Sequence, residues 1–262
     1  MQPAIQQSPN HRLFVTDIDG TIYGPKHPIS QETKVAVALL RRRGIEVTLA
    51  TGRNQWEAQA IVTELGLSLP VILANGAQIF SFSEGHLLYA KPFCLATLMD
   101  FLRKIPADFP LLIRWYAKDS WQECALPDFG EQVGLQEVKR VILLDPSQTL
   151  ELFDADESPY WIFRDGQGQI ELTPKDANKG EGLLELCSLL KIGPGQVVAL
   201  GNDTNDLELI QTAGLGLAVQ GGHPQLLEVC QGITGRMEDH PVRDIAEWMV
   251  GNTPWERIVM WK

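Results

Sequence analysis

Short apolar runs alternate with longer amphipathic segments along the first third of the chain. An apolar run of about four to eight residues is typical of a buried strand, and apolar residues that recur every three or four positions are typical of a helix. Strands that alternate with helices in this order pair in parallel, because each helix carries the chain back across the sheet. The pattern predicts strands at 13–16, 45–50 and 71–74, and helices at 31–43 and 54–65.

The middle of the chain, from about residue 79 to residue 170, shows short aromatic-rich runs instead. Gly85 and several prolines interrupt them, so that no regular alternation of strand and helix develops. This pattern predicts an α+β segment, with strands at 87–91, 111–116, 138–144, 160–164 and 169–172 and helices at 95–104 and 147–155.

The last third returns to alternating strands and helices. It predicts strands at 197–200 and 216–219, and helices at 179–191, 204–211, 224–230 and 242–250. The simplest architecture is α/β, with a Rossmann-like parallel-sheet core at 1–84 and 174–262 that is interrupted by an inserted α+β domain at 85–173.

Composition and charge argue against two classes of partner. The chain has 262 residues, 44% hydrophobic and 21% charged, with a formal net charge of −11. Nucleic-acid binders usually present a basic face, and the largest basic cluster here, Arg41 to Arg43, lies at the end of a predicted helix, where cations are expected anyway. No apolar run reaches the ~18 residues that cross a membrane. We therefore expect neither a nucleic-acid nor a membrane partner.

The cysteines and histidines form no metal-binding pattern. The four cysteines are widely spaced, and the five histidines show no paired spacing, which argues against zinc. Such cysteines indicate reduced thiols and a cytoplasmic location. The first ten residues are polar and lack the apolar centre of a signal peptide, so we expect a frayed tail there.

Two carboxylates follow the first predicted strand directly. Asp17 and Asp19 are one residue apart, so in a continued strand their side chains point to the same side, and Gly20 lets the chain turn away sharply. Carboxylates held this close repel each other, and oxygen ligands without nearby sulfur or imidazole suit Mg²⁺. Taken alone, the string fits either a magnesium site or a strand that ends in an Asp-capped turn.

Three further segments place polar residues where strands end or helices begin. Thr51-Gly52-Arg53 offers a hydroxyl and helix N–H groups, which suit an anion or a plain N-cap. Lys179 begins a helix, where a cation opposes the helix dipole, although a surface lysine is the ordinary explanation. Segment 201–206 has more acids and amides than one helix cap needs. Strand ends of a parallel sheet converge at its carboxyl edge, where ligands bind.

Together these segments resemble the motifs of the haloacid dehalogenase-like (HAD) phosphohydrolases. The four motifs correspond in order to Asp17–Thr21, Thr51–Arg53, Lys179–Gly180 and Gly201–Asp206. Segments 74–77 and 214–219 are similar to the subgroup with a large α+β cap between the second and third motifs, the Cof-type and sucrose-phosphatase-like members. The resemblance covers nearly the whole core, whereas the cap matches in position and size more than in sequence.

The resemblance implies a role for each motif residue. Asp17 is expected to be the nucleophile and Asp19 the general acid and base. Mg²⁺ is expected to bind the Asp17 carboxylate, the Asp19 carbonyl oxygen and Asp206, assisted by Asn202 or Asp203. The residues expected to hold the substrate phosphate are Ile18, Thr51, Gly52, Lys179 and Asn205. The residues expected to shape the site are Gly20, Thr21, Arg53, Asn75 and Gly76.

Position 202 departs from the family pattern, in which the fourth motif usually reads Gly-Asp-x-x-Asn-Asp. Asn202 stands where the family has aspartate. Its amide oxygen can still bind Mg²⁺ or a bound water, and Asp203 is the alternative ligand. Activity is expected to survive this change, because Asp17, Asp19 and Asp206 are present.

These inferences predict a Mg²⁺-dependent phosphatase that hydrolyses a phosphomonoester of a small metabolite through an aspartyl-phosphate. A sugar phosphate or a phosphoglycerate-type conjugate is the expected substrate, and the protein is expected to be a monomer or homodimer. A phosphomutase or other phosphotransferase, and a non-catalytic phosphometabolite-binding protein, stay open as alternatives. In the cap, Arg114, Trp115 and Arg164 are candidates for contact with the leaving group, although ordinary surface or core roles explain each.

Overall fold

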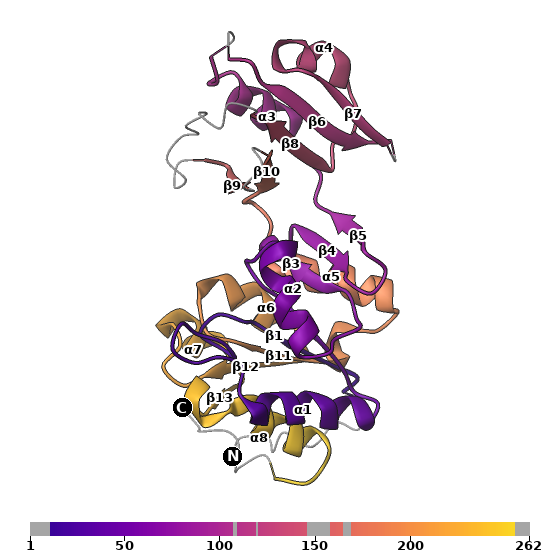
Figure 1. Cartoon of the computed structure of the whole chain (residues 1–262). Coiled ribbons are helices and arrows are strands. Elements are labelled where there is room, and N and C mark those ends of the chain that lie inside the picture. Colours follow the sequence, from indigo (N-terminus) through magenta and orange to yellow (C-terminus); the bar gives the residue numbers. More distant parts are fainter. Residues whose placement is uncertain (1–10, 107–108, 119, 146–157, 165–168, 255–262) are drawn as a thin grey trace. The chain divides into compact units, whose positions relative to one another are not determined.

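The computed structural model describes residues 11–106, 109–118, 120–145, 158–164 and 169–254. The chain divides into two compact units (Figure 1). The first, the core, is formed by residues 1–89 and 178–262, and the second, the insert, by residues 90–177.

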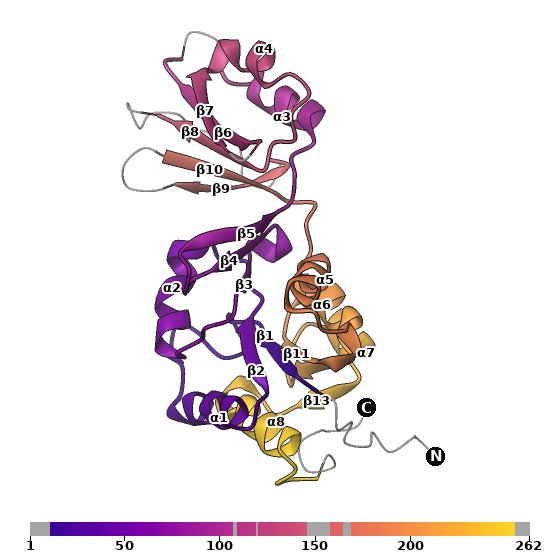
Figure 2. The same ribbon diagram turned by 90° about the vertical axis from the view of Figure 1, so that its right-hand side faces the viewer.

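A five-stranded parallel sheet forms the centre of the core, in the order β13-β12-β11-β1-β2 (Figure 2). Its strands are β1 (Leu13–Thr16), β2 (Glu46–Leu49), β11 (Val197–Gly201), β12 (Leu215–Val219) and β13 (Gly232–Thr234). Thr16 of β1 lies opposite Leu49 of β2 and Leu200 of β11. These three strands therefore end side by side at one edge of the sheet.

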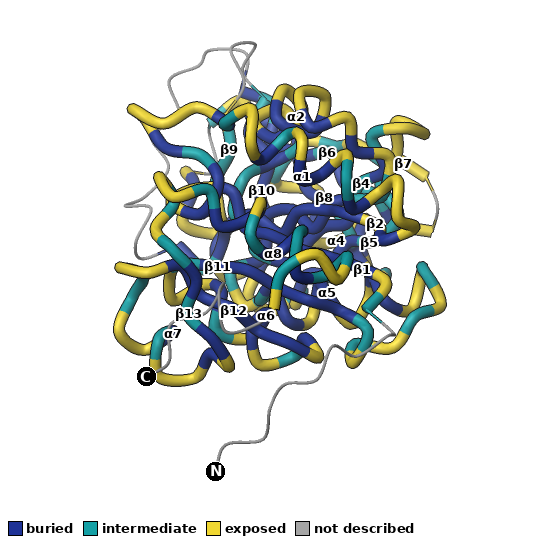
Figure 3. The backbone as a smooth tube through the Cα atoms, turned by 90° about the horizontal axis from the view of Figure 1, so that it is seen from below, coloured by how far each residue is buried: buried dark blue, intermediate teal, exposed yellow. Residues whose placement is uncertain are grey.

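Helices cover both faces of this sheet, because strand residues alternate between two apolar clusters. Phe14 packs with residues of α1, α2 and α8, whereas Leu13 and Val15 pack with residues of α5, α6 and α7. All residues of β1, β11 and β12 are buried (Figure 3). The helices are α1 (Gln31–Arg42), α2 (Gln55–Glu64), α5 (Lys179–Leu190), α6 (Leu207–Thr212), α7 (Pro224–Val229) and α8 (Pro241–Met249).

A small sheet, β3-β4-β5, adjoins the end of β2 through a bridge between Ala50 and Ile72. Its strands are β3 (Val71–Leu73), β4 (Gln78–Ser81) and β5 (His86–Ala90). Ala74, Asn75 and Gly76, between β3 and β4, have φ values of 48°, 52° and 95°. This tight left-handed turn directs the Asn75 side chain to the edge where β1, β2 and β11 end.

The insert is built on an antiparallel sheet in the order β7-β6-β8-β10-β9. Its strands are β6 (Leu112–Ala117), β7 (Ser120–Ala125), β8 (Arg140–Leu144), β9 (Tyr160–Arg164) and β10 (Gln169–Pro174). The insert also contains α3 (Leu95–Leu102) and α4 (Phe129–Val133). Its apolar core includes Trp115, which packs edge-on against Phe129 of α4.

The predicted strands and helices of the core are present, with small shifts at their ends, and the predicted α/β class with an α+β insertion is confirmed. The sequence pattern missed β4, β7, β13 and α4. Strand β7 lies at a sheet edge with mostly exposed residues, and β13 has three residues, so neither gives an apolar run. The helix predicted at 147–155 and the tail predicted at 1–10 lie outside the described residues.

Candidate active site

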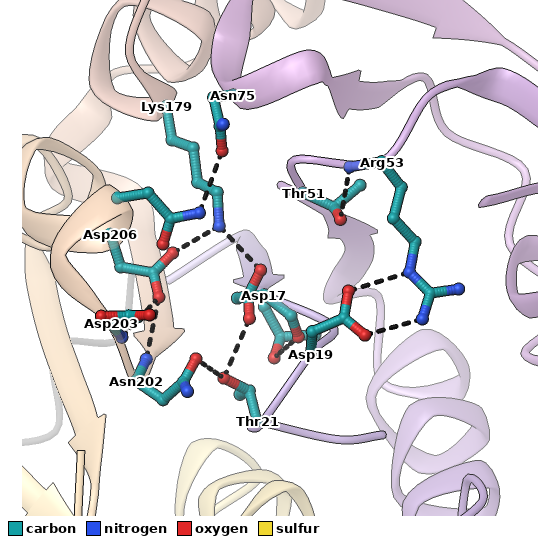
Figure 4. A network of polar contacts seen from close by, with 12 residues as sticks. Asp17, Asp19, Thr21, Thr51, Arg53, Asn75, Lys179, Asn202, Asp203 and Asp206 are labelled. Atoms are coloured by element: carbon teal, nitrogen blue, oxygen red, sulfur yellow. Dashed lines mark hydrogen bonds and ion pairs between the residues drawn. The ribbon is translucent and has the colours of Figure 1, made fainter. Parts of the chain in front are cut away.

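The ends of β1 and β11 bring three predicted motifs together. The Asp17 N–H donates to the carbonyl oxygen of Leu200 at 2.9 Å, which continues the pairing of these strands by one residue. Asp17 therefore lies beside Gly201, where the fourth motif begins. The N-terminus of α5 brings Lys179 to the same place (Figure 4).

Lys179 joins two carboxylates inside the protein. Its Nζ donates to Asp17 Oδ1 at 2.7 Å and to Asp206 Oδ1 at 2.6 Å, and all three side chains are buried. A lysine at a helix start is ordinarily a surface residue, but the Lys179 side chain is 0% exposed. A buried ammonium needs such partners, because an unpaired buried charge is strongly unfavourable.

The pKa values of Asp17 and Lys179 are both raised, for different reasons. Burial raises the pKa of Asp17 to about 6, although Lys179 opposes the shift. For Lys179, burial alone would lower the pKa, but the two carboxylates outweigh it and raise the pKa. Lys179 therefore stays charged and holds Asp17 in place at neutral pH.

The second oxygen of Asp17 faces Thr21 and Asn202. Thr21 Oγ1 donates to Asp17 Oδ2 at 3.2 Å. One atom of the Asn202 amide lies 3.2 Å from that same Oδ2, 3.0 Å from Thr21 Oγ1 and 2.9 Å from the carbonyl oxygen of Asp19. Four residues thus converge on one small polar space at the tip of β1.

Asp206 and Asp203 are occupied elsewhere. Asp206 Oδ2 accepts from the backbone N–H of Asn202 at 2.8 Å and of Asp203 at 3.1 Å, so both oxygens of this carboxylate have donors. Asp203 Oδ1 accepts from the N–H of Thr204 at 2.7 Å, as a cap of the 3₁₀ turn Thr204–Asp206. Of the two candidates at 202 and 203, the structure brings the Asn202 side chain to Asp17.

Asp19 is held by Arg53. Arg53 Nε donates to Oδ2 at 2.8 Å and Nη2 to Oδ1 at 2.6 Å, so the guanidinium engages both carboxylate oxygens. The guanidinium carbon also lies 5.0 Å from the centre of the Tyr23 ring. The Asp19 side chain is 56% exposed and turns away from Asp17 toward the second motif (Figure 4).

Two of the expected phosphate-binding residues line a polar pocket of about 220 Å³ in the core. Gly52 and Asn205 line it together with Asp17 and Asp19, and Asn205 Nδ2 donates to Asn75 Oδ1 at 3.0 Å. Thr51 is buried beside it, and its Oγ1 accepts from the Arg53 N–H at 3.1 Å. Ile18 is buried in the apolar core, so that only its backbone is suited to meet a phosphate.

Sequence reasoning missed Glu57, which also lines this pocket. Its carboxylate accepts from the Asn54 N–H at 3.0 Å and closes a capping box at the start of α2. The pair Asn54 and Glu57, three residues apart before an apolar segment, was the available signal.

The three cap candidates have different surroundings within the insert. Trp115 is fully buried in the apolar core of the insert. Arg114 pairs with Glu123 on the neighbouring strand at 2.6 Å, and Arg164 is exposed at the end of β9. The burial of Trp115 gives it a packing role.

Comparison with known proteins identifies the family. The family model of the haloacid dehalogenase-like hydrolases matches residues 14–123 and 136–245. The chain belongs to this family. As a Cof-type HAD phosphatase it is a phosphoric monoester hydrolase, which favours an enzyme over the non-catalytic binding protein left open by the sequence.

Similar HAD proteins span nearly the whole chain. Phosphatase YwpJ of Bacillus subtilis (strain 168) is 24% identical over 281 residues, covering 88% of this chain and 97% of that protein. A phosphoglycolate phosphatase of Methanopyrus kandleri is 29% identical, covering 79% and 83%. The solved structure of a haloacid dehalogenase-like hydrolase from B. subtilis has a TM-score of 0.60 at 19% identity, covering 92% and 100%. Within the described part of this HAD chain, no helix is long and apolar enough to cross a membrane.

The oxygens near Asn202 fit the Mg²⁺ that HAD hydrolases generally use. Octahedral Mg²⁺ with bonds of about 2.1 Å places neighbouring oxygens about 3.0 Å apart. The Asn202 amide atom is at such distances from the Asp17 carboxylate and the Asp19 carbonyl oxygen. The described residues hold no cluster of three or more His, Cys, Asp or Glu side chains suited to a metal. The oxygens gathered around Asn202 are thus one carboxylate, the Asp19 carbonyl oxygen and the amide oxygen of Asn202 itself.

Proposed function

We propose that this HAD hydrolase cleaves a phosphomonoester of a small metabolite in a Mg²⁺-dependent reaction, with Asp17 as the nucleophile. The observation that carries the proposal is the buried Asp17 carboxylate, held by Lys179 at 2.7 Å and Thr21 at 3.2 Å at the tip of β1. Lys179 fixes one oxygen of the carboxylate, and the Thr21 hydroxyl lies beside the other, in a small polar pocket. Pure binding of a phosphate would not need a buried anion there.

The reaction divides into two displacements at phosphorus. An Asp17 oxygen forms a bond to phosphorus while the bond to the ester oxygen breaks, and the leaving alkoxide takes a proton from Asp19. Water then attacks the aspartyl-phosphate, gives a proton to Asp19 and releases Asp17 and inorganic phosphate. Asp19 suits both proton transfers, because its exposed carboxylate lines the same pocket as Asp17.

The two hydrogen bonds from Arg53 to Asp19 would have to break during this cycle. Both Asp19 oxygens accept from Arg53, which holds the carboxylate toward the second motif. A phosphate or leaving group that draws the guanidinium away would free Asp19 to act as the acid. Arg53 is thus a positioning residue for Asp19 in this proposal.

Neutral and positive groups would stabilise the transferred phosphoryl group. The Asn205 amide and the Gly52 N–H line the pocket. Lys179 donates to the lining residue Asp17, and the Thr51 hydroxyl and the Ile18 N–H are next to lining residues along the chain. Asp17, the Asp19 carbonyl oxygen and Asn202 would hold Mg²⁺. Asp206 would accept from Lys179 and so help to hold the lysine in place. Bound Mg²⁺ would shield the anionic substrate from the Asp17 carboxylate.

A sugar phosphate or a phosphoglycerate-type conjugate is the proposed substrate class. The relative from Methanopyrus kandleri is named for phosphoglycolate, a small phosphorylated acid. The polar pocket of about 220 Å³ suits a phosphoryl group better than an apolar ring. The choice among leaving groups would then depend on the insert, which resembles the family in position and size more than in sequence.

A panel of phosphorylated metabolites, assayed for released phosphate with Mg²⁺ and with excess chelator, tests this function. We expect activity with Mg²⁺, loss in chelator, and loss of several orders of magnitude in kcat for Asp17→Asn. Reaction in H₂¹⁸O should place one ¹⁸O in each phosphate released. Transfer to a second sugar hydroxyl instead of water would identify a phosphotransferase, and substantial activity of Asp17→Asn would exclude Asp17 as the nucleophile.

A further inference from the structure

The Asn202 side chain is confined on two sides. On one side it meets Asp17 Oδ2, Thr21 Oγ1 and the Asp19 carbonyl oxygen at 2.9–3.2 Å. On the other it lies against Gly20, where an added Cβ would come within 2.3 Å of Asn202 Nδ2. Gly20 has a φ of 79°, so a side chain there would be strained as well as obstructed. The amide group can rotate about the Cβ–Cγ bond, but this rotation only exchanges the positions of Oδ1 and Nδ2.

The two orientations of this amide suit different states of the site. With oxygen toward Asp17, it accepts from Thr21 and faces two other acceptors, the Asp17 carboxylate and the Asp19 carbonyl oxygen. Acceptors this close repel one another unless a cation lies among them. With nitrogen toward Asp17, the amide hydrogens have Asp17 Oδ2, Thr21 Oγ1 and the Asp19 oxygen as acceptors within 3.2 Å. That orientation satisfies the site without a metal.

We propose that the Asn202 amide nitrogen takes the place of the cation in the metal-free protein. The amide must then rotate when Mg²⁺ binds, so that its oxygen faces the ion. The inference rests on the Mg²⁺-dependent function proposed above. Lys179 already balances one of the two buried carboxylates, so Asn202 leaves a single net negative charge where the family aspartate would leave two. The result is a metal-free site that is stable and a metal affinity that is correspondingly weaker.

The variant Asn202→Asp tests the proposal because it keeps the shape and removes the amide hydrogens. In excess chelator at pH 7.5, we expect its unfolding midpoint to fall by at least about 2 °C, since a carboxylate then faces Asp17 and the Asp19 oxygen and shares one donor, the Thr21 hydroxyl, with Asp17. Asn54→Asp is the matched control. Asn54 caps α2 by accepting from the N–H groups of Trp56 and Glu57, which aspartate does equally well, so its midpoint should not fall.

Magnesium binding measured by calorimetry gives the second readout, without substrate. We expect Asn202→Asp to bind Mg²⁺ at least about tenfold more tightly than the unchanged protein, because it adds a charge beside a divalent cation. Asn54→Asp should bind Mg²⁺ as the unchanged protein does. An Asn202→Asp protein that is as stable as the unchanged one in chelator, or that gains no affinity for Mg²⁺, would overturn the proposal.

The side-chain amide of Asn202 can also be followed directly by ¹H–¹⁵N NMR, identified by its absence from the Asn202→Asp spectrum. We expect its resonances to move on saturation with Mg²⁺, because the hydrogens leave Asp17 and the Asp19 oxygen. Unchanged resonances in the Mg²⁺-saturated protein would contradict the rotation of the Asn202 amide. Absence of phosphatase activity with all of these results in place would count against the proposed function alone, because none of the measurements uses a substrate.

Discussion

At Asp17, burial and charge act against each other. The side chain is buried, and burial raises its pKa to about 6 against an ordinary 3.8, even with Lys179 at 2.7 Å. A carboxylate that is ionised at neutral pH under these conditions weakens the fold, and in the proposed mechanism this carboxylate is the nucleophile. This is the usual conflict between stability and activity at an active site.

The pH dependence of stability should reveal this conflict. Between about pH 3.8 and 6 the folded metal-free protein holds a proton on Asp17 that the unfolded chain releases, so this residue's contribution to stability falls as pH rises through that window. Asp17→Asn has no such proton. In chelator, we measure the unfolding midpoint of Asp17→Asn minus that of the unchanged protein. We expect this difference to increase as the pH is raised from 4 to 7. A difference that stays constant over this range would show that Asp17 has an ordinary pKa.

The residues of the site were largely predictable, but their partners were not. The strand periodicity placed Asp17 and Asp19 in one pocket, as the structure finds. Strand β1 ends at Thr16, however, so the alternation stops there and the Asp19 carboxylate turns to Arg53. The burial of Lys179 between two carboxylates also depends on contacts between distant segments, which local spacing does not contain.

Among the elements, the turn after β3 carries a structural requirement that no helix or strand pattern shows. Gly76 has a φ of 95°, and a Cβ at this position would lie 2.0 Å from the backbone oxygen of Asn178. Asn178 is the N-cap of α5, which begins with Lys179. The close approach of this turn to α5 therefore helps to set the position of the buried lysine.

Replacement of Gly76 by alanine should be severely destabilising. We expect a loss of more than about 3 kcal/mol in the free energy of unfolding, because a backbone atom blocks the new methyl group. Gly85→Ala is the matched control. Gly85 also has a positive φ, 73°, but nothing lies within 4 Å of its added Cβ, so the backbone strain of about 1–2 kcal/mol acts alone. Equal losses for the two variants in denaturant titrations would contradict the close approach.

Two of the elements that the sequence did not predict, β7 and β13, share a physical cause. Strand β7 pairs with β6 through six residues but exposes most of them, and β13 follows β12 at the sheet edge with three residues. Both are stabilised by backbone pairing with a neighbour and contribute few apolar side chains. Apolar periodicity detects burial, so such strands escape it.

On the scale of the whole molecule, the chain leaves the core once and returns once. The unit boundaries lie between Tyr89 and Ala90 and between Ala177 and Asn178. Near these points within the insert, Lys91 Nζ donates to the carbonyl oxygen of Asp176 at 2.9 Å, so the two connecting segments are held together. A short link between them should therefore be tolerated by the core.

Replacement of residues 90–177 by a flexible Gly/Ser linker of about six residues tests this division. We expect a folded core that cleaves a small activated ester such as 4-nitrophenyl phosphate and discriminates less among metabolites, because the pocket around Asp17 is made of core residues. Circular dichroism and the rates for both substrate types are the measurements. A core that fails to fold without the insert would show that the two units are not independent.

The charges around the pocket also have a consequence for the encounter with substrate. Four acids line it, Asp17, Asp19, Glu57 and Asp203, against one cation, Arg53, on a chain with a net charge of −11. An approaching dianion is repelled until it is within reach of local donors, and ionic strength weakens that repulsion. With Mg²⁺ saturating, kcat/KM should rise as salt increases from about 0.01 M to about 0.15 M. Glu57→Gln can keep the capping contact and should reduce the increase of kcat/KM with salt. A kcat/KM that falls with salt in both proteins would mean that attraction governs the encounter.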